Sequence, residues 1–372
     1  MKKALVISNK IRKIPGGAIE TVVNPLKERG YDVVWAANFS TLKVPIEQFP
    51  CEVLKTTSQT NPFSKGSIKT RKTIQQYLKN NKVDLIFCST PVGGFNGRLC
   101  GKKAKVDKVI YEAHGFLFFK GGPKLGFFYK SIEKWLAKYT DTIITINHED
   151  FENAKKFKIK NRDNVFLVNG SGEDYQSDSI SNEEKQSLRK SLDIEEKDFV
   201  FISIGELNKN KNVLSSVKAF YKAFSNNKNV KMLICGEGKQ DKTINAFINK
   251  RNLSDQIKLL GYRTDVRKLL QISNCYVSTS LREGLSRTVG ESMAASLPCI
   301  VSNKRGLRDW IDDKESFTFE PKNIKQISEC MLRIYNSKDL KQIGDYNKNK
   351  VKEYSSEHII KQFNDIFDKI LN

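Results

Sequence analysis

Short apolar segments alternate with amphipathic segments along the first half of the chain. The apolar segments are rich in valine, isoleucine and phenylalanine, as strands buried on both faces of a sheet should be. We expect strands at residues 3–8, 32–37, 84–89, 108–113 and 142–146, and a helix at about residues 18–30 after a loop with Gly16 and Gly17. This alternation predicts a doubly wound parallel sheet.

The same alternation begins again after a polar, charged stretch at residues 173–190, which we interpret as a linker running into a helix. Further strands are expected at residues 199–204, 230–235, 257–260, 275–279 and 299–302. An amphipathic helix at residues 355–371 ends the chain. The pattern predicts an α/β fold of two Rossmann-like domains, residues 1–172 and residues 173–354, a closing helix at residues 355–372, and a ligand-binding cleft between the domains.

The length and charge of the chain narrow the possible partners. Its 372 residues suit two domains, because single cores stop growing near ~250 residues. Its 64 Lys and Arg residues exceed the 42 Asp and Glu residues, for a net charge of +22, which indicates nucleic acid, an anionic membrane surface or anionic substrates as partners, or compositional drift without a function. No RNP-like aromatic motif, zinc finger or arginine-rich tract supports nucleic acid.

Hydropathy and cysteine usage point to the cytosol. No apolar run reaches the ~18–20 residues that span a bilayer, and residues 1–10 fit a first strand better than a signal peptide. The seven cysteines form no CxxC pair, which predicts buried free thiols in a reducing compartment. With only three histidines, the chain offers no zinc constellation.

The most informative segment is residues 280–298, SLREGLSRTVGESMAASLP. Glu283 lies in the turn after an expected strand, and Glu291 lies eight residues later in a helix that starts near Arg287. The backbone N–H groups of Leu285, Ser286 and Arg287 can face an anion from this helix start. On spacing alone, an ordinary helix-entry acid and a surface glutamate explain the pair at least as well.

This segment resembles the EGL–x5–E signature, a Glu-x7-Glu motif, of the retaining GT-B glycosyltransferases of family 4. Four further segments match the family in order: residues 205–212 (GELNKNKN) as the phosphate loop, residues 236–238 (GEG), residues 261–266 (GYRTDV) as the base-flanking loop, and Pro298 with residues 305–309 (RGLRD). The resemblance implies the GT-B fold, with the C-terminal helix crossing back to the N-terminal domain.

The first half resembles the same family at residues 111–116, YEAHGF, where His114 occupies the position of a histidine placed against the donor sugar. Gly16 and Gly17 resemble the loop whose amides approach the diphosphate or acceptor, although a plain turn explains them equally well. The loop at residues 88–91, CSTP, lacks the histidines of related enzymes, so no catalytic role is transferred to it.

The resemblance therefore implies a catalytic set of His114, Glu283 and Lys211. The implied donor-binding set, with Lys209 added as our own inference, is Gly16, Gly17, Gly205, Lys209, Lys211, Gly236, Tyr262, Arg263, Glu283, Gly284, Leu285, Ser286, Arg287 and Glu291. Lys209 can also be a solvated loop lysine. Glu206 departs from the arginine that many members carry there. We expect no metal and no cofactor besides the nucleotide sugar, because no suitably placed DxD occurs and the family generally needs none.

Aromatic and basic residues mix at residues 117–139, LFFKGGPKLGFFYKSIEKWLAKY, and a second basic stretch covers residues 65–82. Such mixtures suit an anionic membrane interface, although aromatics packed in a core and solvated lysines are the alternative. The region resembles bacterial enzymes of capsule and exopolysaccharide synthesis that extend sugars on undecaprenyl diphosphate.

The sequence hypothesis is thus a peripheral enzyme at the inner face of the membrane that uses a nucleotide sugar, with uridine as the family's commonest base. A transferase with a soluble acceptor, an epimerase of the same fold and a catalytically inactive scaffold are alternatives. A basic nucleic-acid-binding protein is the alternative from another class.

Overall fold

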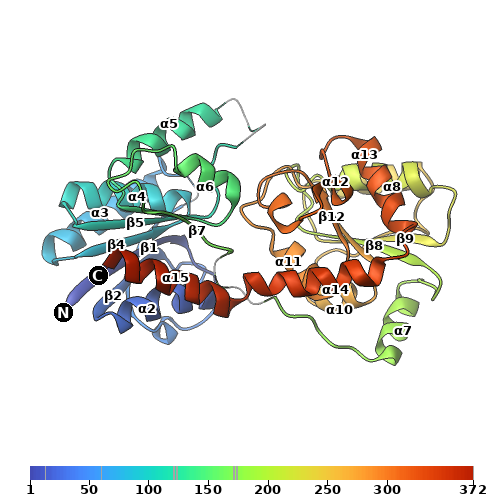
Figure 1. Cartoon of the computed structure of the whole chain (residues 1–372), viewed down its shortest axis with the longest axis horizontal. Helices are drawn as coiled ribbons and strands as arrows, with labels where there is room; N and C mark the ends of the chain where they lie inside the picture. The colour runs from blue at the N-terminus through green and yellow to red at the C-terminus, as the bar shows by residue number, and fades with distance from the viewer. Residues whose placement is uncertain are drawn as a thin grey trace. The chain divides into compact units, whose positions relative to one another are not determined.

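The computed structural model describes residues 1–12, 14–59, 61–119, 122, 125–170, 172 and 175–371. The chain divides into two compact units (Figure 1). Unit 1 comprises Met1–Glu173 and Ser355–Asn372, and unit 2 comprises Asp174–Tyr354.

The described strands of unit 1 form a seven-stranded parallel sheet in the order β3-β2-β1-β4-β5-β6-β7. They are β1 (Lys2–Lys10), β2 (Tyr31–Asn38), β3 (Glu52–Lys55), β4 (Leu85–Ser89), β5 (Lys108–Ala113), β6 (Thr142–Thr145) and β7 (Val165–Leu167). All five strands expected in this half are present. The short strands β3 and β7 were not expected, because each has only half-buried or exposed residues and therefore no continuous apolar run.

Helices cover both faces of this sheet. They are α1 (Gly16–Ala18), η1 (Ile19–Val23), α2 (Asn24–Glu28), η2 (Ile46–Gln48), α3 (Lys65–Asn80), α4 (Pro91–Ala104), α5 (Gly126–Ala137), α6 (His148–Ala154) and α15 (Ser356–Leu371). The helix expected at residues 18–30 runs as α1, η1 and α2, and η1 is a single turn of π-helix. Such turns are frequent near functional sites.

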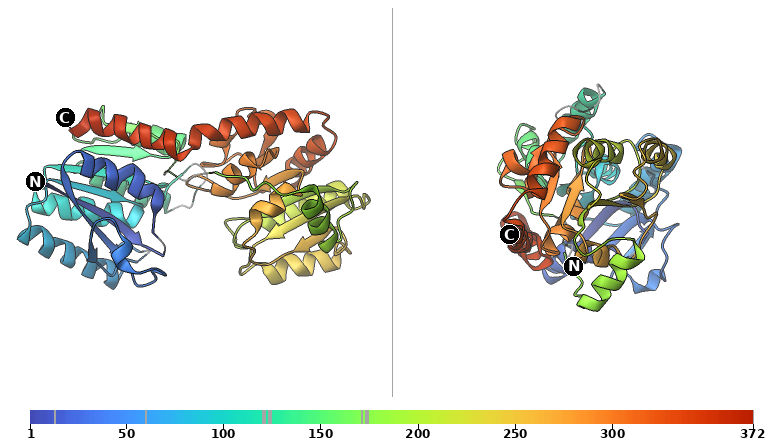
Figure 2. Two further views of the ribbon diagram at one scale, coloured as in Figure 1. Left: turned by 90° about the horizontal axis from the view of Figure 1, so that it is seen from below. Right: turned by 90° about the vertical axis from the view of Figure 1, so that its right-hand side faces the viewer.

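The last helix belongs to unit 1, as the predicted return of the C-terminal helix requires. Phe363 and Phe367 of α15 are fully buried, and the Phe367 ring packs on Phe87 of β4 at 6.3 Å between centroids. The Arg29 guanidinium, just after α2, lies 2.6 Å from Asp368. Figures 1 and 2 show α15 beside α2, with both chain ends in this unit.

A buried ion pair joins α4 to α5. Arg98 Nη1 lies 2.8 Å from Glu133 Oε2, and the Arg98 guanidinium also lies 3.9 Å from the centre of the Tyr111 ring. Arg98 is fully buried, and Glu133 is 8% exposed. Burial opposes the charge on Arg98, but the Glu133 carboxylate, together with Tyr111 and Cys88, raises the pKa of the guanidinium. This pair fixes the position of α5 on the sheet.

The described strands of unit 2 form a six-stranded parallel sheet in the order β10-β9-β8-β11-β12-β13. They are β8 (Phe199–Ile204), β9 (Val230–Cys235), β10 (Ile257–Leu259), β11 (Cys275–Ser278), β12 (Cys299–Ser302) and β13 (Thr318–Phe319). Its helices are α7 (Asn182–Ser191), α8 (Val213–Phe224), α9 (Asp241–Lys250), α10 (Val266–Gln271), α11 (Arg287–Ala294), η3 (Arg308–Trp310), α12 (Lys314–Phe317), α13 (Ile324–Tyr335), α14 (Leu340–Lys350) and η4 (Val351–Tyr354). Every strand expected in this half is present, and only the two-residue β13 was missed.

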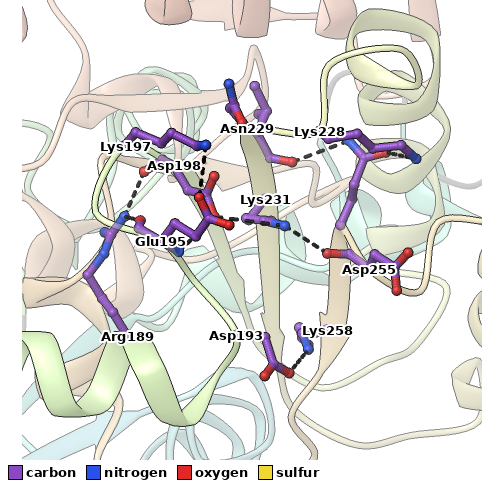
Figure 3. A network of polar contacts seen from close by, with 12 residues as sticks. Arg189, Asp193, Glu195, Lys197, Asp198, Lys228, Asn229, Lys231, Asp255 and Lys258 are labelled. Atoms are coloured by element: carbon purple, nitrogen blue, oxygen red, sulfur yellow. Dashed lines mark hydrogen bonds and ion pairs between the residues drawn. The ribbon is translucent and has the colours of Figure 1, made fainter.

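Paired charges cover the edge of this sheet where β8, β9 and β10 begin (Figure 3). Lys258 Nζ lies 2.6 Å from Asp193, which lowers the pKa of that carboxyl, and Lys231 Nζ donates to the Asp255 carbonyl at 3.1 Å. Arg189 donates to the carbonyls of Glu195 and Asp198, at 2.7 Å each. Part of the lysine excess therefore serves structure at the edge opposite the predicted site.

The cysteines are free thiols, as expected; six are buried and Cys51 is half-buried. Burial raises the pKa of Cys88 to about 12 and that of Cys51 to about 11. These thiols are poor nucleophiles.

Removal of one partner of the buried pair should destabilise unit 1. We expect Glu133→Leu to lower the free energy of unfolding by about 3–5 kcal/mol, because Arg98 would keep an uncompensated buried charge. The double variant Arg98→Met/Glu133→Leu should recover most of this loss, since it removes both charges. Urea denaturation of the full chain measures both, with Lys134→Gln on the exposed side of α5 as control. A loss below about 1 kcal/mol for Glu133→Leu would show that α5 does not depend on the pair.

Candidate functional site

Two neighbouring strands of unit 2 carry the central contact of the predicted donor site. The carboxyl ends of β8 and β11 lie side by side, because these parallel strands pair directly. The loop after β8 holds Lys211 and the loop after β11 holds Glu283, and Lys211 Nζ donates to Glu283 Oε1 at 2.8 Å. Both side chains are partly exposed, at 24% and 16%, so the pair is accessible to a ligand.

Asparagines hold the Lys211 loop in place. The Asn208 side chain accepts hydrogen bonds from the backbone N–H groups of Asn210 and Lys211, at 2.9 Å each. Asn212 takes a left-handed conformation, at φ 55°, and its amide donates to the carbonyls of Thr279 and Pro321. The sequence interpretation missed these roles, although asparagine tolerates this conformation better than most residues.

The Glu283 loop is fixed by the segment after β12. Glu283 N–H donates to the Arg305 carbonyl at 3.2 Å, and Ser286 N–H donates to the Gly306 carbonyl at 3.1 Å. Gly306 has φ 71°, and a Cβ there would lie 2.3 Å from the Gly284 carbonyl oxygen, so only glycine fits. The expectation that the Ser286 amide faces an anion is wrong, because its hydrogen is already donated.

Arg287 and Glu291 lie one turn apart on α11 and contact each other. Arg287 Nε donates to Glu291 Oε1 at 3.0 Å, and the Arg287 side chain is 47% exposed. The sequence assigned these residues to separate parts of a nucleotide sugar. In the structure Arg287 contacts the Glu291 carboxylate, and their donor-binding roles stay a prediction.

The predicted phosphate loop at Gly205 and the glycine turn at Gly236 pack on each other. A Cβ at Gly236, which has φ 139°, would lie 2.0 Å from the Gly205 carbonyl oxygen. The Gly205 N–H donates to the Cys235 carbonyl at 2.9 Å, at the end of β9. Close packing leaves the loop after β8 little freedom. Lys209, on the same loop, is exposed, as is Glu206.

The expected base-flanking loop presents one free aromatic ring. Tyr262 is 75% exposed, and its N–H donates to Glu237 Oε1 at 3.2 Å. Arg263 forms a two-bond contact with Asp265, at 2.8 and 2.6 Å, which lowers the pKa of the Asp265 carboxyl. Arg263 therefore carries a charge that is largely balanced within its own loop.

In unit 1, His114 follows β5 and contacts a buried carboxylate. His114 Nε2 lies 2.9 Å from Glu112 Oε2, and the Glu112 side chain is only 5% exposed. The two residues lie two apart at the end of β5, so their side chains share a face. Asp150 accepts from the Phe116 N–H at 3.0 Å and holds the segment after His114. The sequence interpretation missed Glu112, whose position two residues before the histidine was the available signal.

The neighbouring strand end carries backbone strain. Thr90, after β4, has φ 67° and ψ 158°, a conformation that a threonine rarely adopts. Its N–H donates to the Glu112 carbonyl at 3.2 Å, which links this residue to the strand of His114. Strain of this kind gathers at functional sites.

Gly16 and Gly17 begin α1 after β1. A Cβ at Gly16 would meet nothing within 4 Å, so packing does not require glycine there. Gly17 instead lies against Gly172, whose own Cβ would approach the Gly17 carbonyl oxygen at 3.1 Å. Within unit 1 these glycines lie at the same sheet edge as His114.

The aromatic and basic stretch divides into a buried part and an exposed part. Phe118 is buried, 5% exposed, and stacks on Phe116 at 5.0 Å, so for this ring the alternative of packing in the core is correct. Phe127, Phe128 and Trp135 of α5 are exposed, at 73%, 47% and 43%. Lys120 and Lys124 lie outside the described residues, whereas Lys134 and Lys138 are exposed on α5 or directly after it.

Within the described ranges, no three His, Cys, Asp or Glu side chains gather as metal ligands. No helix in this part of the chain has the length and hydropathy needed to cross a bilayer.

Comparisons with known proteins agree with this geometry. Residues 184–351 match the family model of the glycosyl transferases group 1, and residues 18–147 match that of the glycosyl transferase 4-like domains. The chain is 29% identical over 354 residues to EpsD of Bacillus subtilis (strain 168), a provisionally assigned glycosyltransferase, with 93% of this chain and 91% of that protein covered.

Two further proteins resemble the chain. The first is the UDP-Gal:alpha-D-GlcNAc-diphosphoundecaprenol alpha-1,3-galactosyltransferase of Escherichia coli, 27% identical over 284 residues, with 75% of this chain and 73% of that enzyme covered. The crystal structure of Anabaena HepE in complex with UDP shares the fold, with a TM-score of 0.78 at 16% identity and both chains fully covered. The chain is therefore a glycosyltransferase of the GT-B fold, built from a glycosyl transferase 4-like domain and a group 1 domain.

Proposed function

We propose that this protein is a retaining transferase that moves a sugar from a UDP-sugar to a sugar linked to undecaprenyl diphosphate, in the synthesis of a bacterial surface polysaccharide. The observation that carries the proposal is the accessible contact of Lys211 with Glu283 at the carboxyl edge of the unit 2 sheet. Ligands of open parallel sheets bind at this edge.

The Lys211–Glu283 pair suits the charges of sugar transfer. The bond between the anomeric carbon and the β-phosphate oxygen breaks, and the departing diphosphate gains negative charge. The Lys211 ammonium has three N–H donors, of which one contacts Glu283, so others are available to the diphosphate. The Glu283 carboxylate can accept hydrogen bonds from sugar hydroxyls.

Retention requires the acceptor oxygen to bond to the anomeric carbon on the face that the diphosphate leaves. The acceptor hydroxyl then gives its proton to the departing phosphate oxygen, and the products are a glycoside and UDP. His114, held by Glu112, would hydrogen-bond a hydroxyl of the donor sugar from unit 1 and orient the ring.

Support for uridine and for a lipid-linked acceptor comes from the proteins that resemble the chain. HepE was crystallised with UDP, and the name of the Escherichia coli enzyme contains both a UDP-sugar and a diphosphoundecaprenol acceptor. Tyr262 offers an exposed ring on which a base can stack. These features favour UDP as the carrier.

An enzyme that uses a lipid-linked acceptor must reach the membrane surface. The exposed face of α5 has residues that suit contact with that surface. Phe127, Phe128 and Trp135 are exposed on this helix beside the exposed Lys134 and Lys138. Aromatic rings enter the headgroup region and lysines bind anionic lipids. We place the protein at the inner face of the cell membrane, bound at its periphery, in the cytoplasm.

The transfer reaction itself can be tested directly. Lys211→Ala should lower kcat about 10²–10³-fold, the effect of removing one donor to a developing negative charge. Glu283→Gln should lower kcat/KM, because it changes the group that faces the sugar. The assay follows UDP release and label transfer from a panel of UDP- and GDP-sugars to undecaprenyl-diphosphate-linked sugars and to simple sugars.

Lys218→Ala, at an exposed position of α8 outside the donor-binding set, is the matched control and should retain the wild-type activity. Lys209→Ala decides whether Lys209 binds the donor or is a solvated loop lysine. Transfer to simple sugars alone would replace the lipid acceptor by a soluble one. Absence of nucleotide-sugar binding, together with duplex or single-strand binding that survives Glu283→Ala, would favour the nucleic-acid-binding alternative.

Glu112 should act through His114. We expect Glu112→Gln to lower kcat about 10–100-fold with little change in the KM for the donor, because a misplaced catalytic group loses rate more than binding. In a double-mutant cycle, Glu112→Gln should cost little once His114 is already alanine. Additive losses would mean that Glu112 supports the fold instead, and thermal unfolding of each variant controls for that.

The exposed face of α5 should determine membrane binding. The triple variant Phe127→Ser/Phe128→Ser/Trp135→Ser should bind vesicles of phosphatidylglycerol and phosphatidylcholine at least tenfold more weakly in sedimentation, because three exposed rings lose their place in the interface. Tyr346→Ser, an exposed aromatic of unit 2, should bind like the wild type. Equal binding of the triple variant would exclude α5 as the membrane-facing element.

A further inference from the structure

Unit 1 contains a cavity whose described lining includes none of the predicted catalytic or donor-binding residues. Its volume is about 530 Å³, within the ~300–1,000 Å³ of pockets that hold small ligands. It lies where β2 ends at Asn38 and β3 ends at Lys55, under the segment that follows β2. It therefore opens at the carboxyl edge of the sheet, the edge that also carries His114.

Polar and apolar groups line this cavity in similar measure. The apolar side is formed by Phe39, Leu42, Val44 and Ile46. The polar side is formed by hydroxyls, amides and one ammonium group, from Asn38, Ser40, Lys55, Thr56, Thr57 and Gln59. The lining residues that the structure describes include no carboxylate.

One hydroxyl of a lining residue lacks a hydrogen-bond partner among the described residues. Thr56 is 9% exposed, and its Oγ1 makes no hydrogen bond to any described residue. A buried hydroxyl without a partner costs stability. By contrast, Thr57 Oγ1 donates to the Gly66 carbonyl at 3.0 Å, and Asn38 Nδ2 donates to the Ser58 carbonyl at 2.9 Å. Thr56 Oγ1 has almost no accessible surface, so a ligand in the cavity meets other lining groups, such as the exposed Lys55 and Gln59.

The apolar side of the cavity includes one aromatic ring, that of Phe39. The Phe39 ring is half-buried and meets the Phe49 ring edge-on, at 5.2 Å between centroids. Sugars bind where an aromatic face meets their C–H groups and nearby polar groups meet their hydroxyls, which is the composition found here.

The sheet gives the distance from this cavity to His114. In the order β3-β2-β1-β4-β5, the cavity lies between the first two strands and His114 follows the last. Neighbouring strands are ~4.8 Å apart, so three to four spacings give roughly 15–19 Å. This distance is longer than one sugar ring and shorter than an oligosaccharide of several rings.

We infer that this cavity binds an inner sugar of the acceptor glycan, so that the enzyme extends an acceptor of two or more sugars. The inference rests on the proposed transferase function, because that function places the terminal sugar of the acceptor, which receives the transferred sugar, near His114. Polar groups form about half of the lining, and this disfavours a polyprenyl chain as the occupant. Among the described lining residues, the lack of carboxylates and the presence of Lys55 favour neutral or acidic sugars over cationic ones.

Saccharide binding to the full chain tests the inference. Saturation-transfer NMR would compare maltose, lactose and N,N′-diacetylchitobiose with glucose, galactose and N-acetylglucosamine. At least one disaccharide should bind tenfold more tightly than its monosaccharide. Ser40→Trp should weaken that binding at least tenfold by filling the cavity, and Gln59→Leu should weaken it about three- to tenfold by removing an exposed lining amide. Thr41→Trp, an exposed neighbour outside the lining, should bind like the wild type.

The outcomes separate this inference from the proposed function. No saccharide binding by the wild type, or equal binding by Ser40→Trp, would overturn the glycan site. UDP binding to unit 2 should be the same in all variants. If saccharides bind in the cavity but no UDP-sugar is consumed, the transferase proposal fails and the cavity is not an acceptor site. If transfer occurs and Ser40→Trp uses one-sugar and two-sugar lipid acceptors with the same kcat/KM as the wild type, the inference alone fails.

Discussion

The parallel pairing of strands is the constraint on which both units depend. Parallel strands bring their carboxyl ends to one edge, and the loops that leave that edge then carry the polar side chains. In unit 2, the pairing of β8 with β11 brings together Lys211 and Glu283, which are 72 residues apart in the sequence. In unit 1, the same arrangement places His114, the start of α1 and the cavity beside Asn38 along one edge.

Many of the positive side chains contact acceptors within the protein, so the net charge of the chain overstates the number of cations available to a ligand. Lys231 and Lys258 contact acceptors where the strands of unit 2 begin, and Arg287 and Arg263 each contact a carboxylate on their own helix or loop. These cations are therefore held by the protein. Lys211 also has a carboxylate partner, but both members of that pair reach the surface at the carboxyl edge. The N–H donors of Lys211 that do not contact Glu283 leave this cation suited to a phosphate.

The buried contact of Arg98 with Glu133 joins the core of unit 1 to its surface. Glu133 faces the core from α5, while Phe127 and Phe128 of the same helix are exposed. One face of α5 is therefore attached to the core by the ion pair, and the opposite face exposes the aromatic rings. The Tyr111 ring packs on the Arg98 guanidinium in the core beneath this helix.

The sequence by itself determined the strands that are continuous apolar runs, the return of the closing helix and the residue types of the Glu-x7-Glu segment. It missed β3, β7 and β13, because short strands with half-exposed residues do not differ from loops in pattern. The contact of Glu112 with His114, the asparagines that hold Lys211 and the hydrogen bond that occupies the Ser286 amide were decided only by the tertiary structure. Spacing along a chain defines which residues share a strand or helix, but hydrogen bonds between loops depend on which strands become neighbours. That order follows from the packing of the whole sheet, and no local pattern contains it.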